Sequence, residues 1–292
     1  MNADEDHFAS IASEHTATIK SSAEWLPKTF FSHFRLTTRE QAMKSRDYLG
    51  SVVIGILVLG GCVVPQHEFE IRRTWPADSI KQLEVQAVNG KIEVTAGTSN
   101  QITMTAKGTT SGPAGRDGNI VRDEVSDGTL RIHEQGRNNY SVFQIRHGRH
   151  VDYTFQVPAT LAGLKLTNVN GKISISGISG KLVTHSVNGQ IYVSTPRAEL
   201  TAVTVNGSVN AEFLEQFSGA HLKTVNGAIA VSVPANSSID CNVSQVNGNF
   251  RSDIPLLTTS SRGSTSGSAN QGQFPFEATT VNGSVTLSKN RG

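Results

Sequence analysis

The sequence predicts an all-β fold of the β-solenoid type, because one short turn motif recurs at a nearly constant spacing between runs of alternating apolar residues. The motif is Val-Asn-Gly, and its seven copies begin at Val88, Val169, Val187, Val205, Val225, Val246 and Val281. Successive copies are 81, 18, 18, 20, 21 and 35 residues apart. A period of about 20 residues is typical of repeat architectures, in which each unit stacks on its neighbours.

Alternate positions on both sides of the motif are apolar. The residues five before each Val are Leu83, Leu164, Leu182, Leu200, Ala220, Cys241 and Phe276, and those four after it are Ile92, Ile173, Ile191, Val209, Ile229, Phe250 and Val285. This period of two predicts strands with one buried face. Each repeat is therefore a strand, an Asn-Gly turn, a second strand and a second turn. Asn and Gly both tolerate positive φ, which suits a tight corner.

Two architectures satisfy this pattern. Antiparallel hairpin repeats would use Asn-Gly as a two-residue turn, whereas a β-solenoid would place each motif directly above the last. The steady period and the like side chains at equivalent positions favour the solenoid, because stacking rewards apolar columns and an Asn ladder. We expect the repeat domain over 69–289, with irregular coils at 95–160, regular coils at 161–255 and a flexible Gly/Ser loop at 257–273.

Composition argues against several classes of function. Charged residues make up 17% of the chain and the net charge is +2, so no strong field indicates nucleic acid or an acidic partner. No phosphate-binding loop or nucleophile elbow is found. The sequence His147-Gly-Arg-His150 is the nearest approach to a pair of metal ligands. Two histidines without a nearby cluster of carboxylates or cysteines rarely bind a metal ion, so a basic loop is the preferred interpretation. We therefore predict no cofactor, no metal ion and no catalytic residue.

The alternative function is a carbohydrate-active enzyme built on a β-helix. Such enzymes need acid and base groups that converge in a groove. The repeats offer only scattered carboxylates, namely Glu199, Glu212, Glu215, Asp240 and Asp253. A non-catalytic binding or scaffold domain is the preferred interpretation.

Cys241 lies in an inward column beside Val243, so we expect a buried thiol.

The amino-terminal region carries an export signal. An apolar run from Tyr48 follows Lys44 and Arg46 and ends in Leu-Gly-Gly-Cys62, the layout of a secretory signal. These last four residues resemble a lipobox, which implies that Cys62 is lipidated and becomes the first residue after cleavage. Residues 43–61 would then be the signal peptide and 62–68 a short tether. An uncleaved membrane anchor is the alternative, but 48–64 is 17 residues long, where a span needs about 20.

The segment before this signal does not resemble a signal peptide. Residues 1–42 are acidic in places and show no sustained apolar periodicity, so we expect translation to start at Met43 or the segment to be a disordered extension. A genuine cytoplasmic segment is the alternative. Val63 follows the cysteine, where inner-membrane lipoproteins of enteric bacteria carry Asp. We therefore expect a cell-envelope protein on the periplasmic face of the outer membrane, held to the membrane by the lipid on Cys62.

Two stretches resemble a known family. Tyr153–Pro158 leads into Leu164–Ile175, which contains a Val-Asn-Gly turn between alternating apolar residues, and another such unit, Val281–Leu287, ends the repeats. Over roughly 68–289 the chain resembles the putative-adhesin family of β-strand-repeat domains of unknown function. The resemblance implies a β-solenoid and an envelope location. The word adhesin in that name rests on fold analogy, which is a weak warrant for function.

One segment has the composition of an interface centre. Residues 137–150 combine arginines with aromatic side chains in the less regular part of the array, and Arg with aromatics suits anionic envelope polymers, lipid head groups or an envelope protein. The candidate ligand contacts are Arg137, Tyr140, Phe143, Arg146 and Arg149. A solvated basic loop whose apolar residues complete a strand is the alternative interpretation.

Overall fold

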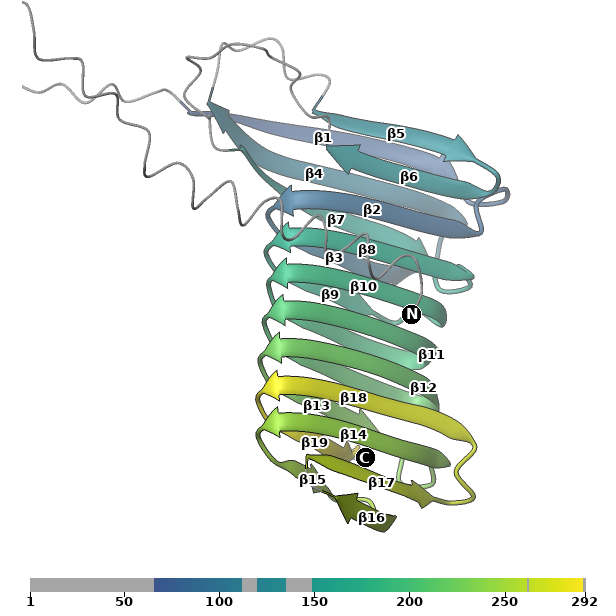
Figure 1. Ribbon diagram of the computed structural model, residues 1–292. Coiled ribbons are helices and arrows are strands. Elements are labelled where there is room, and N and C mark those ends of the chain that lie inside the picture. The colour runs from purple at the N-terminus through teal and green to yellow at the C-terminus, as the bar shows by residue number, and fades with distance from the viewer. Residues whose placement is uncertain (1–65, 112–119, 135–148, 262, 291–292) are drawn as a thin grey trace, which may run out of the picture. The chain divides into compact units, whose positions relative to one another are not determined.

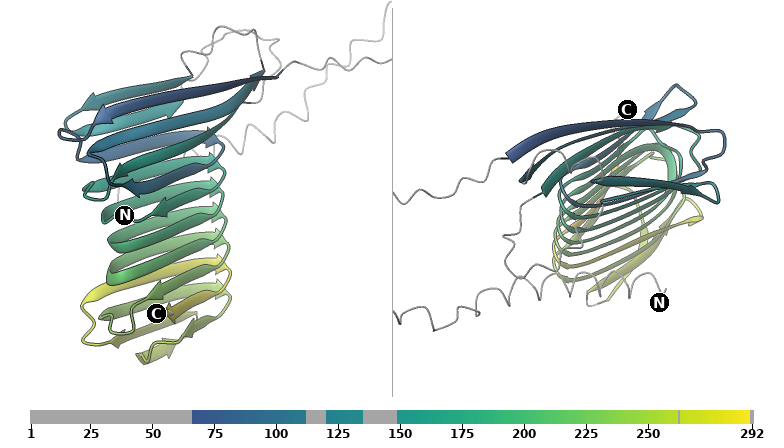
Figure 2. Two further views of the ribbon diagram at one scale, coloured as in Figure 1. Left: turned by 180° about the vertical axis from the view of Figure 1, so that it is seen from behind. Right: turned by 90° about the horizontal axis from the view of Figure 1, so that it is seen from above.

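In the computed structural model, residues 66–111, 120–134, 149–261 and 263–290 are described, and these ranges form an all-β solenoid (Figure 1). Their 19 strands belong to one hydrogen-bonded sheet. The sheet winds into a stack of coils with two facing walls, seen from behind and end-on in Figure 2. The predicted fold class is confirmed. Within these ranges no helix is long and apolar enough to cross a membrane.

Each regular coil has one strand in each wall, joined at the Val-Asn-Gly corner. The first wall contains β2 (Gln82–Asn89), β8 (Gly163–Asn170), β10 (Gly180–Asn188), β14 (Ile239–Asn247) and β18 (Phe274–Asn282). The second wall contains β3 (Ile92–Gly97), β9 (Ile173–Ser176), β13 (Ile229–Val233), β15 (Phe250–Ser252) and β19 (Val285–Lys289). The long strands β11 (Ile191–Asn206) and β12 (Val209–Asn226) pass from the second wall to the first.

Stacked strands pair in parallel and in register, which excludes the hairpin alternative for the motif-bearing strands. Leu182 of β10 lies opposite Leu164 of β8 on one side and Leu200 of β11 on the other. The column continues with Leu83, Ala220, Phe276 and Cys241, and all its members are at most 1% exposed. Burying a leucine side chain contributes about 1.5–3 kcal/mol, so this column is a principal part of the core. Cys241 is buried as predicted.

The 81-residue gap does not contain four further coils between the first two motifs. Asn89 pairs directly with Asn170, so the first motif coil stacks on the second. The stretch predicted to form irregular coils, 95–160, forms an excursion at the outer side of the β2–β3 coil. It comprises β4 (Gln101–Ser111), β5 (Val121–Ser126), β6 (Thr129–Glu134) and β7 (Arg149–Pro158). Strands β6 and β7 lie parallel to β2 and β3, while β4 and β5 are antiparallel additions.

The first strand of the chain lies at one end of the stack, whereas the last two strands lie between coils formed earlier in the chain. Strand β1 (Gln66–Pro76) pairs antiparallel with β4. At the other end, β18 and β19 lie between the β12–β13 coil and the β14–β15 coil, although they come last in the chain (Figure 1). The order of coils in space therefore differs from their order in sequence.

The segment predicted as a Gly/Ser loop is mostly a β-hairpin. Strands β16 (Leu257–Ser261) and β17 (Ser264–Ala269) pair antiparallel, and β17 pairs with β14. The open edge of β14 offers backbone donors and acceptors to any neighbouring chain, and pairing satisfies both partners. Availability of that edge, which local composition does not encode, explains why a loop-like sequence is extended here.

The predicted Asn ladder is present at the Val-Asn-Gly corner. Six of the seven motif asparagines donate their Nδ2 to the Oδ1 of the asparagine in an adjacent coil, at 2.8–2.9 Å, while Asn89 at the end of the ladder accepts only. In spatial order the ladder is Asn89, Asn170, Asn188, Asn206, Asn226, Asn282 and Asn247. None of the seven has a positive φ, so the ladder, and not tolerance of left-handed backbone, is the reason for asparagine.

The motif glycines are required by the contact between coils. A Cβ on Gly207 would lie 2.0 Å from the carbonyl oxygen of Gly189, and Gly189 stands in the same relation to Gly171. Of the seven, only Gly90 and Gly171 have φ in the left-handed region, at 126° and 137°. The carbonyl of one coil thus occupies the space that a side chain of the next would need.

A buried polar column supports these carbonyls. The residue before each motif valine is often a small polar residue, and Thr204, Thr224 and Thr280 donate their hydroxyls to glycine carbonyls of adjacent coils at 2.9–3.2 Å. Asn168 does the same through Nδ2 at 2.7 Å. Each bond satisfies a carbonyl that would otherwise be poorly paired inside the corner, which is worth about 1 kcal/mol. This polar column has no counterpart among the features predicted from the sequence.

We predict that Gly207→Ala lowers stability by about 1–3 kcal/mol, because the added methyl overlaps the Gly189 carbonyl of the adjacent coil. Gly163→Ala is the matched control, since a Cβ there makes only ordinary contacts, 3.5 Å or more from its neighbours. Thermal and urea unfolding of both variants would measure the difference. Equal stability of the two would contradict the steric role of the motif glycine.

Candidate functional site

The structure locates one of the six site residues predicted from sequence. Arg149 begins β7 and lies opposite Thr110 of β4. Its carbonyl oxygen accepts a hydrogen bond from Nδ2 of Asn89 at 3.3 Å, so Arg149 lies at one end of the Asn ladder. The other five residues, Cys62, Arg137, Tyr140, Phe143 and Arg146, fall outside the described residues.

A half-buried acid lies close to Arg149. Glu134 ends β6, and its Oε1 accepts a hydrogen bond from the backbone N–H of Val88 at 3.2 Å. Burial raises the pKa of Glu134, while the bond from Val88 and the positive charges of Arg149 and His150 oppose that rise. Desolvation dominates because the carboxyl group is held at the corner of the stack.

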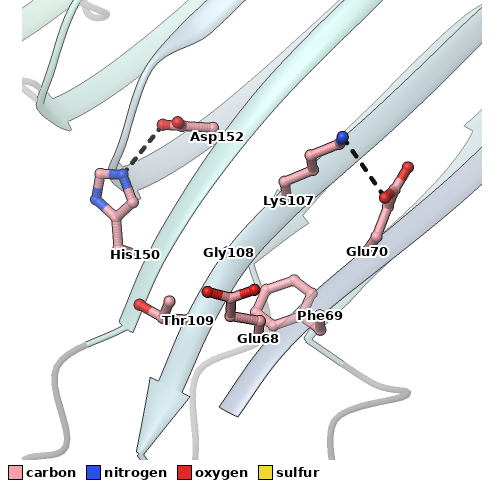
Figure 3. A pocket seen from close by; sticks show the side chains of 8 residues that line it. All are labelled: Glu68, Phe69, Glu70, Lys107, Gly108, Thr109, His150 and Asp152. Atoms are coloured by element: carbon pink, nitrogen blue, oxygen red, sulfur yellow. Dashed lines mark ion pairs between the residues drawn. The ribbon is translucent and has the colours of Figure 1, made fainter. Parts of the chain in front are cut away.

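A polar hollow lies on strands β1, β4 and β7 at the same end of the solenoid (Figure 3). Its volume is about 510 Å³. The lining residues are Glu68, Phe69 and Glu70 of β1, Lys107, Gly108 and Thr109 of β4, and His150 and Asp152 of β7. Phe69 is paired across the strands with Gly108, which in turn lies opposite Val151.

The absence of a side chain at Gly108 lets the three strands approach one another. A Cβ on Gly108 would lie 2.1 Å from the carbonyl oxygen of His150 and 2.8 Å from Cζ of Phe69. A larger residue would have to displace β7 backbone or the aromatic ring. Gly108 therefore leaves room for the ring of Phe69, and both residues line the hollow (Figure 3).

Opposite charges are paired within the hollow. Nζ of Lys107 lies 3.5 Å from Oε2 of Glu70, and Nε2 of His150 lies 3.1 Å from Oδ1 of Asp152. Oδ1 of Asp152 also accepts a hydrogen bond from the backbone N–H of Lys91 at 2.8 Å. A hydrogen bond from Arg72 holds the pKa of Glu70 below its ordinary value. The hollow can thus offer donors and acceptors of both signs to a polar ligand.

Comparison with protein families assigns the fold. The model of the family described as Toastrack DUF4097 matches residues 53–288. The chain belongs to the Toastrack family. This agrees with the resemblance to the putative-adhesin family, and it is a family of unknown function without an established enzymatic activity.

Several solved structures are similar to this Toastrack protein. A putative adhesin from Bacteroides fragilis is 14% identical, with 76% of this chain and 97% of that one covered and a TM-score of 0.39. A putative cell adhesion protein from Clostridium sporogenes is 10% identical, with 77% and 100% covered and a TM-score of 0.37. A putative lipid binding protein from Parabacteroides distasonis is 10% identical, with 76% and 97% covered and a TM-score of 0.32. No curated protein matches the chain.

Two reactive side chains of the Toastrack domain are parts of its core. Burial raises the pKa of the Cys241 thiol to about 11, so the thiol stays protonated near neutral pH. Tyr153 is fully buried and stacked against Phe155, with ring centroids 6.2 Å apart, and burial raises its pKa as well.

Among the described residues, no group of three or more His, Cys, Asp or Glu side chains could hold a metal ion.

Most residues of the hollow were not predicted from the sequence. Glu68, Phe69, Glu70, Lys107 and Asp152 lie on three strands far apart in the chain. The only signal was the alternation of charged and apolar residues at 68–71. That alternation predicts a strand with a polar face but cannot identify which strands pair with it.

We predict that Glu134→Gln stabilises the protein at neutral pH and that the gain shrinks as the pH falls toward 4.5. The pKa of Glu134 in the folded protein is raised above its ordinary value of 4.5, so the folded protein favours the protonated carboxyl group. The stability that this proton contributes is present at low pH and is lost as the pH rises through the folded-state pKa, where the buried carboxyl group becomes charged. Glutamine stays neutral and keeps an acceptor for Val88. Melting temperatures from pH 4.5 to 7.5, with Glu199→Gln at an exposed site as control, would measure this. A pH-independent difference from the parent would contradict it.

Proposed function

We propose that this Toastrack protein is a cell-envelope lipoprotein whose solenoid is a non-catalytic binding or scaffold domain. The observation that carries the proposal is Leu-Gly-Gly-Cys62 at the end of the apolar run that follows Lys44 and Arg46. Small residues before the cysteine suit cleavage, and a diacylglycerol on Cys62 would hold the protein in a membrane. Since Val63 follows the cysteine in place of Asp, we propose the periplasmic face of the outer membrane.

The partner in this proposal is an envelope polymer or an envelope protein. The proposed contacts are Arg137, Tyr140, Phe143, Arg146 and Arg149. Two features support them: Arg149 lies near the half-buried Glu134, and His150, next in sequence, lines the polar hollow. Binding residues often lie on irregular segments positioned by a rigid scaffold, and Arg149 and His150, the described end of the segment, begin β7.

The arrangement of carboxylates supports a non-catalytic role over the carbohydrate-active alternative. Glycoside hydrolysis uses two carboxyl groups with different protonation states on either side of a bond. In the hollow, each carboxylate has a basic partner: Nζ of Lys107 lies 3.5 Å from Glu70, and the His150 ring lies 3.1 Å from Asp152. Such ion pairs position charges for recognition.

We predict that Cys62→Ala abolishes lipid labelling and membrane association, because it removes the sulfur that accepts the lipid. Cells fed labelled palmitate would be compared for incorporation and for partition of the protein into detergent. Cys241→Ala is the control, since that thiol is buried in the core and its loss should leave labelling unchanged. Retained labelling in Cys62→Ala would refute the lipoprotein assignment.

We predict that changing Arg137, Arg146 and Arg149 together to Glu weakens binding to isolated envelope fractions about tenfold or more at low salt, because the contact becomes repulsive toward an anionic partner. The difference should narrow at high salt, where exposed charges are screened. A control triple change at the exposed residues Lys181, Arg251 and Lys289 matches the change in charge. Circular dichroism would verify folding. Equal binding of the two triple variants would exclude this segment as the contact.

A further inference from the structure

The Val-Asn-Gly corner carries an exposed strip that runs along the whole stack of motif coils. We call it the Val-Asn strip and define it as the seven motif valines with the seven asparagines of the ladder. Its valines in spatial order are Val88, Val169, Val187, Val205, Val225, Val281 and Val246. In Figure 1 it follows the edge where the arrowheads of β2, β8, β10, β18 and β14 lie one above another.

The valines of the strip are not explained by the core. They project outward, and four of them, Val281, Val225, Val88 and Val246, are 36%, 39%, 43% and 72% exposed. The outward position two residues earlier on the same strands varies in chemistry, with Gln86, Thr167, His185, Val203, Lys223, Thr279 and Ser244. The other three, Val169, Val187 and Val205, are half-buried. An apolar side chain repeated seven times at an outward position, beside a position that varies, indicates a contact surface.

The asparagines of the strip retain half of their hydrogen-bonding capacity. A carboxamide has two N–H donors and two acceptor lone pairs. Each of the seven uses one donor, six of them within the ladder and Asn89 to the carbonyl of Arg149, and all but the terminal Asn247 use one acceptor in the ladder. Six of the seven side chains are exposed, and Asn89 is half-buried. Each coil therefore presents a free N–H and a free lone pair next to an apolar methyl surface.

The repeat of the strip restricts what can lie along it. Coils are spaced by about 4.8 Å, and the glycine contacts and the ladder hold that spacing. An extended polypeptide advances about 3.3–3.4 Å per residue and would lose register within a few coils. A linear polysaccharide in an extended conformation advances by one ring at nearly the coil spacing, with C–H groups on the ring faces and hydroxyl or acetamido groups at the edges. The strip contains no ionisable side chain, which suits a neutral chain.

We propose that the Val-Asn strip binds a linear, neutral polysaccharide laid along the solenoid axis. The C–H faces of successive sugar rings contact the valines, and their hydroxyl or acetamido groups bond the unused amide groups of the asparagines. This inference rests on the proposed binding function and names its ligand class. The strip reaches the predicted contact segment, since Asn89 at its end donates to the carbonyl of Arg149.

The test uses the full chain in mild detergent, mixed with three insoluble, neutral and extended polysaccharides: chitin, cellulose and linear β-mannan. Starch, whose chains coil, is the negative control. The variant Val187→Glu with Val205→Glu places charges on two central coils of the strip. Its matched control, Val183→Glu with Val203→Glu, alters the same residue type at outward positions of the same strands β10 and β11. Thermal unfolding verifies that both variants are equally folded.

We expect the parent to be retained on at least one of the three extended polysaccharides and not on starch. The strip variant should lose about tenfold or more in apparent affinity, since the charges would be buried without partners under the sugar, while the control variant stays close to the parent. Comparison of chitin with the other two polysaccharides separates recognition of acetamido groups from recognition of hydroxyl groups alone. Absence of retention on all three, equal retention on starch, or equal behaviour of the two variants would overturn the inference. None of these outcomes bears on lipid labelling of Cys62 or on the arginine contact, which are tested separately.

Discussion

The close approach of one motif glycine to the next is the contact on which the solenoid depends. In six of the seven copies a Cβ would stand 1.8–2.0 Å from a glycine carbonyl oxygen of the adjacent coil. Only hydrogen fits there, so the corner can stack at the strand spacing. That spacing in turn brings the asparagine amides to 2.8–2.9 Å and places the apolar columns in register. The buried threonine hydroxyls complete the corner by bonding the same carbonyls.

Regularity of the corner contrasts with the amino-terminal end of the stack. There β1, β4 and β5 pair in antiparallel fashion. Hydrogen bonds between side chains also connect β5 with β1, because the carboxylate of Asp123 accepts hydrogen bonds from Arg73 and from Nε1 of Trp75. Charged and aromatic side chains on these outer strands blunt a sheet edge that would otherwise remain open to pairing. The polar hollow lies within this irregular end, which fits the general rule that recognition sites lie where a rigid scaffold stops being regular.

The two regions divide the properties expected of a binding domain. A periodic, uncharged strip suits a long and repetitive ligand, whereas the hollow and Arg149 offer localised charges. Both are held by backbone contacts and ladders with little freedom to rearrange. Preorganisation of this kind reduces the entropy lost on binding, so a solenoid without a deep cavity can still serve as a recognition surface.

The sequence by itself determined the strand period, the identity of the inward columns, the Asn ladder and the burial of Cys241, because parallel stacking in register brings equivalent positions of each repeat together. It also showed Arg149 as a candidate contact, but the structure describes none of the other five predicted site residues. Only the tertiary structure decided that β18 and β19 lie between earlier coils, that residues 257–269 form a hairpin, and that Glu70, Lys107 and Asp152 share one hollow. Every coil presents the same backbone edge, so local sequence cannot specify which coil or strand pairs with it; that choice depends on contacts between residues far apart in the chain.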